Sequence, residues 1–448
     1  MPLVTGQGTL RSQIEAALRG AVRSGHLSAN SILPSSRVLA HDLGVSRGVV
    51  VGAYEQLTSE GFLISLPRGR TIVAPRARTV IPRVRAAAPQ VLRYDFRPGL
   101  PDVREFPRRE WSRAAKQALR TASHRDLGYG DVSGVERLRI CLAEYLARVR
   151  AVDTMPGDVL ICGGVTQALG LAVRALVASG IRNVAIEDPS HPDLRRLVAA
   201  AGARVVSVRV DEQGLIVPRL ANTSARAVIV TPAHQFPTGA ILSSQRRLEL
   251  VRWAVSCGGF VIEDDYDAEF RYDAPPVGAI QGLAPACVIY TGSASKILAP
   301  GLRLGWMCLP PRLLDATADA KRLADLGSPA LDQLIYAEFL ESGGLDSHLR
   351  RMRLIYRKRR DTLVRTLTKS ESWTVKGTAA GLHLVAALSS GADESQIVST
   401  ARARGVGLYP MSFYCRERRR ASEHAFVFGY GHLSEAAIEH GLVLAFGK

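Results

Sequence analysis

The chain of 448 residues lacks several features that would place it in a membrane or outside the cell. No run approaches the ~18 consecutive apolar residues that a membrane-spanning helix needs. The first thirty residues contain no basic region followed by an apolar run and a cleavage site. The six cysteines are scattered without a CxxC pair, which argues against a disulfide framework or a zinc site: Cys141, Cys162, Cys257, Cys287, Cys308 and Cys415. These absences predict a cytoplasmic protein.

Acidic residues are scarce relative to basic ones. The chain holds 58 lysines and arginines against 41 acidic residues, a formal net charge of +17. Residues 1–93 contain twelve arginines, no lysine and four acidic residues, so this fifth of the chain carries +8. Such a balance favours a polyanionic partner, nucleic acid before a membrane surface. The alternative is a protein that is basic throughout without a dedicated partner.

The length predicts a small domain followed by a large one. Residues 75–93 contain three prolines and five arginines without a regular period, which is typical of a linker. Extended at ~3.1 Å per residue, this linker could reach roughly 60 Å. From Tyr94 onward, apolar strand-like runs alternate with amphipathic helices, and a smaller mixed region follows the basic helix after about residue 345. We therefore expect domains at 1–74 and 94–448, the second an α/β fold with a mostly parallel sheet and a smaller C-terminal α+β subdomain.

The N-terminal segment predicts three helices and a two-stranded wing. Apolar residues recur at helical spacing from Leu10 to Val22, and Gly25 can end that helix. Ser35 can cap a second helix that Gly44 ends, and a third helix starts at Ser46 after a very short turn. Two short helices around a tight turn are typical of a helix-turn-helix. The wing is formed by residues 62–64 and 71–73 around a basic turn.

Residues 33–37, 43–47, 54–57 and 60–63 resemble the winged helix-turn-helix of the GntR family of regulators, over about residues 9–74. The resemblance implies binding to double-stranded promoter DNA. Ser46 and Arg47 would lie at the start of the recognition helix, where side chains meet base edges and backbone amides meet phosphate. Arg37 would contact a phosphate or a guanine edge, and Arg68 and Arg70 would contact the minor groove or the backbone.

One departure from that family concerns the residues after Arg47. The family often has a polar pair there, whereas this chain has Gly48 and Val49, so fewer side chains can read bases and the operator sequence is left open. The alternative for the whole segment is a three-helix protein-interaction module with solvated arginines.

A second motif comprises residues 290–296 and 300–306, an apolar strand with small residues, a lysine, and an arginine seven positions later. It resembles the cofactor site of fold-type I pyridoxal-phosphate enzymes. By that resemblance Lys296 would form the Schiff base with pyridoxal 5'-phosphate. Ser293, Ser295 and Arg303 would bind the phosphate, the arginine through a charge-assisted fork.

Three further segments extend this resemblance. In residues 261–267, Asp264 would keep the pyridine nitrogen protonated and Tyr266 would donate to the cofactor's phenolic oxygen. Backbone amides at Gly164, Val165 and Thr166 would bind phosphate at the start of a helix. In residues 232–239 the asparagine usual in aminotransferases is replaced, so Gln235 or His234 would contact the ring oxygen. His191 stands where a ring-stacking tyrosine is usual.

Both halves together resemble the MocR subfamily of GntR regulators, over nearly the whole chain, with residues 234–239 and 263–267 characteristic of it. The resemblance implies a regulator that senses pyridoxal phosphate, as in control of vitamin B6 synthesis, or an amine that condenses with it. It also implies a homodimer in which Tyr129 reaches the neighbour's phosphate and each DNA-binding domain packs on the partner. The alternatives are a working aminotransferase with an N-terminal appendage, and a regulator that has lost its cofactor.

The effector that we expect follows from the absence of one arginine at the position where aminotransferases bind the substrate carboxylate. Aminotransferases of this fold hold the substrate carboxylate with an arginine near the C-terminus, but the corresponding strand, residues 424–430, has none. The preceding run of Arg416, Arg418, Arg419 and Arg420 is typical of a solvated loop. This absence favours pyridoxal phosphate itself as the signal. Arg97 is an alternative residue for holding an effector's acidic group.

Overall fold

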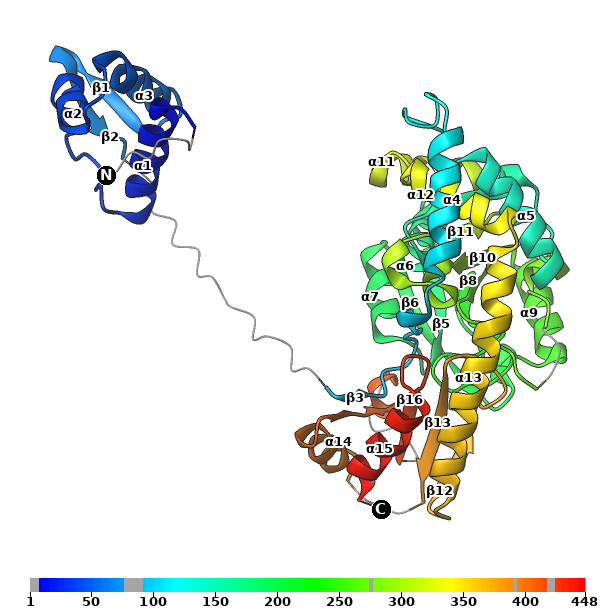
Figure 1. The fold of residues 1–448 in the computed structure, drawn as a ribbon. Helices are drawn as coiled ribbons and strands as arrows, with labels where there is room; N and C mark the ends of the chain where they lie inside the picture. The colour runs from blue at the N-terminus through cyan, green and yellow to red at the C-terminus, as the bar shows by residue number, and fades with distance from the viewer. Residues whose placement is uncertain (1–7, 76–91, 274–276, 390–392, 417–423, 448) are drawn as a thin grey trace. The chain divides into compact units, whose positions relative to one another are not determined.

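The computed structural model describes residues 8–75, 92–273, 277–389, 393–416 and 424–447 (Figure 1). Contacts between Cα atoms divide the chain into two compact units, Met1–Pro89 and Gln90–Lys448. Residues 76–91, most of the predicted linker, lie outside the described part of the chain, as do Arg418, Arg419 and Arg420. No helix in the described ranges combines the length and the apolar character needed to cross a bilayer.

The first unit has the predicted three helices and wing. Its elements are α1 (Leu10–Ser24), α2 (Ser36–Leu43), α3 (Arg47–Ser59), β1 (Leu63–Leu66), the 3-10 turn η1 (Pro67–Gly69) and β2 (Arg70–Val73). The hydroxyl of Ser35 accepts a hydrogen bond from the amide of Val38 and caps α2, and Gly44 ends that helix in the left-handed conformation at φ 65°. β1 and β2 pair antiparallel, from Leu63 with Val73 to Leu66 with Arg70. The winged helix-turn-helix is confirmed.

The second unit contains a large, mostly parallel sheet of eight strands in the order β4-β11-β10-β9-β8-β5-β6-β7. β5, β6, β8, β9 and β10 run parallel, while β11 and β7 pair antiparallel with their neighbours. The strands are β4 (Val159–Cys162), β5 (Asn183–Asp188), β6 (Arg204–Asp211), β7 (Gly214–Leu215), β8 (Ala227–Val230), β9 (Phe260–Asp265), β10 (Val288–Ser293) and β11 (Gly305–Cys308).

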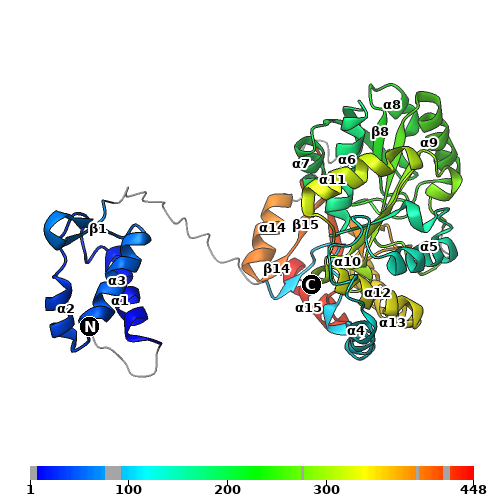
Figure 2. The ribbon, with the colours of Figure 1, turned by 90° about the horizontal axis from the view of Figure 1, so that it is seen from above.

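Helices cover both faces of this sheet, which explains why its central strands carry apolar residues on both faces. One core joins α6 and α7 to residues such as Ile186, Ile262 and Met307, and a second joins α9 to Val228 and Val261. Figures 1 and 2 show α6, α7 and α11 on one side of the strands and α5 and α9 on the other. These helices are α5 (Glu136–Arg150), α6 (Val165–Ala178), α7 (Pro192–Ala200), α8 (Val217–Ala221), α9 (Ser244–Cys257), α10 (Ala294–Ile297) and α11 (Leu314–Asp325).

A smaller C-terminal part packs against the large sheet through a 25-residue helix, α13 (Gly344–Thr368). Its antiparallel sheet has the order β12-β13-β16-β15, and a short parallel pair joins β14 to β3. The remaining elements are β3 (Tyr94–Asp95), α4 (Arg108–Thr121), α12 (Ala330–Glu341), β12 (Trp373–Lys376), β13 (His383–Leu388), α14 (Glu394–Ala403), β14 (Val406–Gly407), β15 (Tyr409–Pro410), β16 (His424–Gly429) and α15 (Glu435–Phe446). The predicted α/β fold with a smaller C-terminal α+β part is confirmed.

Candidate functional site

A cavity of about 440 Å³ lies at the carboxyl ends of the parallel strands. In open α/β sheets ligands bind at this edge, because the loops that follow neighbouring strands converge there. The register brings Thr291 of β10 beside Asp264 of β9, and Ser293 beside Gly305 of β11. The predicted site residues that line the cavity are Val165, Thr166, His191, Asp264, Tyr266, Ser293, Ser295, Lys296 and Arg303.

Lys296 lies in α10, the single turn that follows β10, and it is partly buried. Nζ donates a hydrogen bond to the carbonyl oxygen of Gly99, 2.5 Å away. Burial lowers the pKa of this amine, while the negative charges of Asp267 and Asp264 act in the opposite direction. An amine that loses its proton more readily is a better nucleophile toward an aldehyde.

Asp264, near the end of β9, faces the same cavity. Burial raises the pKa of its carboxyl to about 7, and the neighbouring charge of Asp265 adds to this effect. Its Oδ1 is buried and has no hydrogen-bond partner among the described residues. A buried acceptor without a donor destabilises a protein, so a protonated ring nitrogen placed here would satisfy it and favour its ionised form. The Asp264 carboxylate therefore fits the protonated nitrogen of a pyridine ring.

The opposite end of the cavity suits a phosphate. Arg303 has a left-handed backbone (φ 50°), and its Nη2 donates to the carbonyl oxygen of Gly163 at 2.5 Å. A Cβ on Gly164 would lie only 3.3 Å from that guanidinium, and one on Gly305 would lie 2.7 Å from the Cα of Gly164. The guanidinium thus lies beside the first turn of α6, where free amides of a 14-residue helix attract anions.

Two predicted site residues with aromatic rings, Tyr266 and His191, also line the cavity. Tyr266 is half-buried, and its hydroxyl donates to the backbone carbonyl of His234 at 2.8 Å. His191 caps α7 by accepting a hydrogen bond from the amide of Asp193, and its ring centroid lies 5.8 Å from that of Phe236.

Three predicted residues do not line the cavity: Gly164, Gln235 and Tyr129. Gly164 is the N-cap of α6 and supports the phosphate end through its backbone. The amide of Gln235 is buried, donating to Glu187 at 3.2 Å and accepting from the hydroxyl of Thr238 at 2.6 Å. Tyr129 is 97% exposed. Neither Gln235 nor His234 is placed where we expected a contact with the ring oxygen.

Other cavity residues were not expected from the sequence. Phe236, next to Gln235, lines the wall, and Glu187 at the end of β5 lies at the base. Burial raises the pKa of Glu187 to about 7, although hydrogen bonds from Thr231 and Gln235 counteract the rise. Neighbouring side chains in a loop point in different directions, so either Gln235 or Phe236 could have faced the cavity. No feature of the sequence distinguished the two.

Neither Arg97 nor the C-terminal strand provides the arginine with which an aminotransferase holds the carboxylate of an amino acid. Nε of Arg97 donates to the hydroxyl of Tyr409 at 2.9 Å, and that hydroxyl donates to Asp95 at 2.8 Å. β16 contains no arginine, and its Val427 is buried in an apolar cluster with Phe236 and Tyr414. Arg303 is the only arginine among the described residues that line the cavity.

In the first unit, four predicted DNA-binding residues can be placed on the helix-turn-helix and the wing. Arg37, Ser46, Arg47 and Arg70 are all exposed, and Nε of Arg47 donates to the hydroxyl of Ser36 at 3.4 Å. Ser46 is the N-cap of α3 but makes no capping hydrogen bond, so its hydroxyl is available to a ligand. Arg68 lies in η1.

Two family profiles match the chain. The family Aminotransferase class I and II matches residues 101–424, and the family Bacterial regulatory proteins, gntR family, matches residues 10–73. The probable rhizopine catabolism regulatory protein MocR of Rhizobium meliloti is 32% identical, over 97% of this chain and 92% of that protein. The HTH-type pyridoxine biosynthesis transcriptional regulator PdxR of Corynebacterium glutamicum is 32% identical, over 95% of this chain and 93% of that protein.

Solved structures match the large unit. LysN, an α-aminoadipate aminotransferase from Thermus thermophilus complexed with N-(5'-phosphopyridoxyl)-L-leucine, is 26% identical with a TM-score of 0.70. The alignment covers 79% of this chain and 90% of LysN. The fold of the second unit is therefore that of an aminotransferase.

Proposed function

Because this chain belongs to the MocR subfamily of GntR-type transcription regulators, we propose that it regulates transcription in response to pyridoxal 5'-phosphate. Pyridoxal 5'-phosphate is the cofactor of the aminotransferase-like unit. When bound, it supplies an aldehyde that a lysine amine can attack and a ring nitrogen that a carboxylate can hold in its protonated form. The first unit binds DNA, as a GntR-type helix-turn-helix does.

One observation carries the choice of signal: the cavity has the residues for the cofactor and, among the residues described, no second arginine for an amino acid. Lys296 would hold the aldehyde, Asp264 the ring nitrogen and Arg303 the phosphate. A carboxylate is best held by a bidentate arginine, which an apolar residue cannot replace. The wall near β16 instead presents Phe236, backed by Val427. An effector that brings its own phosphate fits this distribution of charge better than an amino acid.

A second candidate signal is an amine that condenses with the cofactor. His191 and Phe236 leave part of the wall aromatic and open to solvent, which would suit an amine without a carboxylate. Arg97 could hold an acidic effector only by exchanging its hydrogen bond to Tyr409. Turnover as an aminotransferase is a further alternative, and an assay with amino acids and keto acids tests it directly.

We also propose a homodimer in which each DNA-binding unit packs on the partner, head to tail. The 97% exposure of Tyr129 in the single chain supports a role at the neighbour's cofactor phosphate. Sedimentation of Tyr129→Ala with and without cofactor tests this role, because a tyrosine that contacts the neighbour's phosphate links cofactor affinity to the dimer.

The deciding experiment is titration of the cofactor-free protein on DNA from upstream of its own gene. Pyridoxal 5'-phosphate should change the DNA affinity, whereas pyridoxal without the phosphate should act only at much higher concentration. Arg303→Ala should reduce the difference between these two ligands, because the guanidinium is the charged group that the phosphate would contact. If the cofactor leaves binding and transcription unchanged while one amine alters them, the protein is an amine sensor.

A further inference from the structure

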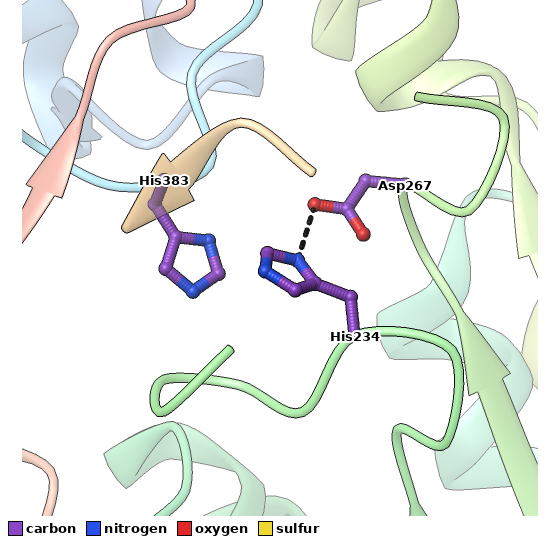
Figure 3. Close-up of side chains that lie close together, drawn as sticks. All are labelled: His234, Asp267 and His383. Carbon is purple, nitrogen blue, oxygen red and sulfur yellow. Dashed lines mark hydrogen bonds and ion pairs between the residues drawn. The ribbon is translucent and has the colours of Figure 1, made fainter. Parts of the chain in front are cut away.

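Three side chains that the cofactor assignment leaves unused form a buried polar cluster beside the cavity (Figure 3). His234 lies in the loop after β8, Asp267 follows β9, and His383 begins β13 of the smaller sheet. Their exposed fractions are 1%, 1% and 0%. Polar atoms of the three lie within 4.8 Å of one another, and the two imidazole centroids are 4.5 Å apart.

His234 connects this cluster to a residue of the cavity wall. Its Nδ1 lies 3.2 Å from Oδ2 of Asp267 and also 3.2 Å from the hydroxyl oxygen of Tyr266. The rings of His234 and Tyr266 are stacked, with centroids 6.2 Å apart. Tyr266 lines the cavity and His234 does not, so His234 lies behind the tyrosine as seen from the ligand.

Asp267 determines which nitrogen of His234 carries the proton. A carboxylate accepts hydrogen bonds only, and Asp267 accepts from His234 Nδ1 and from the backbone amide of Leu382, 3.2 Å away. The proton is therefore on Nδ1, and Nε2 has no partner among the described residues. From this position Nδ1–H can donate to the oxygen of Tyr266 as well.

Close packing holds the ring in this orientation. A Cβ on Gly381, whose φ is 76°, would lie 2.1 Å from His234 Nδ1 and 2.4 Å from Asp267 Oδ2. The backbone before β13 thus lies directly against the His234–Asp267 pair. His383 contributes on the other side, where its Nε2 donates to the carbonyl oxygen of Pro237 at 3.2 Å. The His234 imidazole is thus packed between the Gly381 backbone and the His383 ring.

We propose that His234, oriented by Asp267, is a positioning residue that keeps the hydroxyl of Tyr266 available as a hydrogen-bond donor to the cofactor's ring oxygen. When the tyrosine oxygen accepts from Nδ1–H, its own proton is free to point into the cavity. The alternative acceptor for that proton is the backbone carbonyl of His234, and a negatively charged ring oxygen is the stronger acceptor. The proposal rests on the proposed function in that Tyr266 faces the cofactor.

The charges around Tyr266 favour the same role. Burial raises the pKa of its phenol well above the usual value, and the acidic side chains of Asp267, Asp264, Glu187 and Asp265 act in the same direction. Lys296 and Arg303 are the cationic side chains among the described residues that line the cavity. The phenol therefore stays protonated, as a donor must.

The test is the pH midpoint of the visible absorption band of the bound cofactor. A donor to the ring oxygen stabilises that oxygen as an anion, so loss of the donor raises the midpoint, by roughly one to two pH units for Tyr266→Phe. His234→Phe keeps the ring contacts but removes Nδ1, and it should raise the midpoint in the same direction. His234→Asn places an amide donor near the position of Nδ1 and should restore much of the wild-type midpoint.

A double-mutant cycle decides whether the two residues act together. The variant with both Tyr266→Phe and His234→Phe should show the midpoint of Tyr266→Phe alone, because His234 acts through the tyrosine. His383→Phe is the matched control: it changes a buried histidine of the same cluster that has no bond to Tyr266, and it should leave the midpoint unchanged. Additive shifts, an unshifted His234→Phe, or an equal shift in His383→Phe would overturn the proposal.

Two further measurements separate this result from the proposed function. Borohydride trapping of the cofactor on Lys296, and the response of DNA binding to the cofactor, should both persist in His234→Asn. If trapping fails in the wild type, the proposed function fails, whatever the midpoints show. If His234→Phe does not fold, Asp267→Asn replaces it: the new amide can donate to Nδ1, reverse the tautomer and raise the midpoint in the same way.

Discussion

Arg150 donates a hydrogen bond from Nε to Oδ2 of Asp265, 2.7 Å away, and both side chains are almost completely buried. The hydroxyl of Tyr290 donates to the same carboxylate oxygen at 2.7 Å. Asp265 is the last residue of β9 and the neighbour of Asp264, so this ion pair fixes the strand end that carries the cavity's carboxylate. The ion pair thereby connects the end of α5, which carries Arg150, to the strand end beside the cofactor cavity.

Arg150→Met should destabilise the second unit by about 3–5 kcal/mol, because it leaves a buried carboxylate without its cation. Denaturant unfolding followed by tryptophan fluorescence measures this effect, since all four tryptophans belong to residues 90–448. Arg148→Met is the control on the same helix. Its ion pair with Asp346, at 2.9 Å, is 59% exposed on the arginine side, so the change should stay within about 1 kcal/mol. Equal unfolding midpoints for the two variants would contradict the prediction.

Glu187 should make the cofactor-free protein less stable as the pH rises. Its pKa is raised from 4.5 to about 7 in the folded state, mainly by burial. Between these two values the unfolded chain loses the proton while the folded chain keeps it, so stability falls as the pH increases and levels off above about 7. The full effect is on the order of 3 kcal/mol.

Glu187→Gln removes this titration while keeping the size of the side chain. The variant should therefore become more stable relative to the wild type as the pH rises from 5 to 8. Glu212→Gln, which changes an exposed residue, should show no such trend. Because other buried carboxyls titrate in both proteins, the difference between variant and wild type is the quantity to compare. A difference that stays constant with pH would show that Glu187 is ionised throughout.

Much of the site was predictable because parallel strands end at one edge of a sheet. Lys296 follows β10, Asp264 lies next to the end of β9 and Thr166 lies in the first turn of the helix after β4, so three motifs far apart in the chain had to converge. Local capping chemistry likewise predicted the start of α2 at Ser35 and its end at Gly44.

The unpredicted parts depend on contacts between distant segments. Gln235 does not line the cavity, and its side-chain amide is bound by Glu187, 48 positions earlier, and by the backbone carbonyl of Pro189. Asp267 accepts a hydrogen bond from the backbone amide of Leu382 across 115 positions, which brings His383 next to His234. No spacing within either segment encodes such a pairing, so reading one motif at a time could not find the cluster.

Lys296→Ala should abolish covalent attachment of the cofactor, because no other described lysine lines the cavity. Borohydride treatment of the wild type should leave the cofactor bound to the protein after denaturation, with the modified peptide containing residue 296. Lys116→Ala, which changes an exposed lysine, should label as the wild type does. Label retained in Lys296→Ala would place the attachment elsewhere.

Arg47→Ala should weaken specific DNA binding by roughly 1–3 kcal/mol if its side chain reads a base, and should relax the preference at one position of the operator. Arg37→Ala and Arg70→Ala should weaken all sequences alike and lower the salt dependence by about one phosphate contact each. Arg11→Ala is the control, because that side chain is paired with Glu15 on α1 at 2.8 Å. Footprinting and fluorescence anisotropy at several salt concentrations measure these effects. With Gly48 next to it offering no side chain, an Arg47 variant of unchanged specificity would mean that the operator is read by backbone contacts and DNA shape.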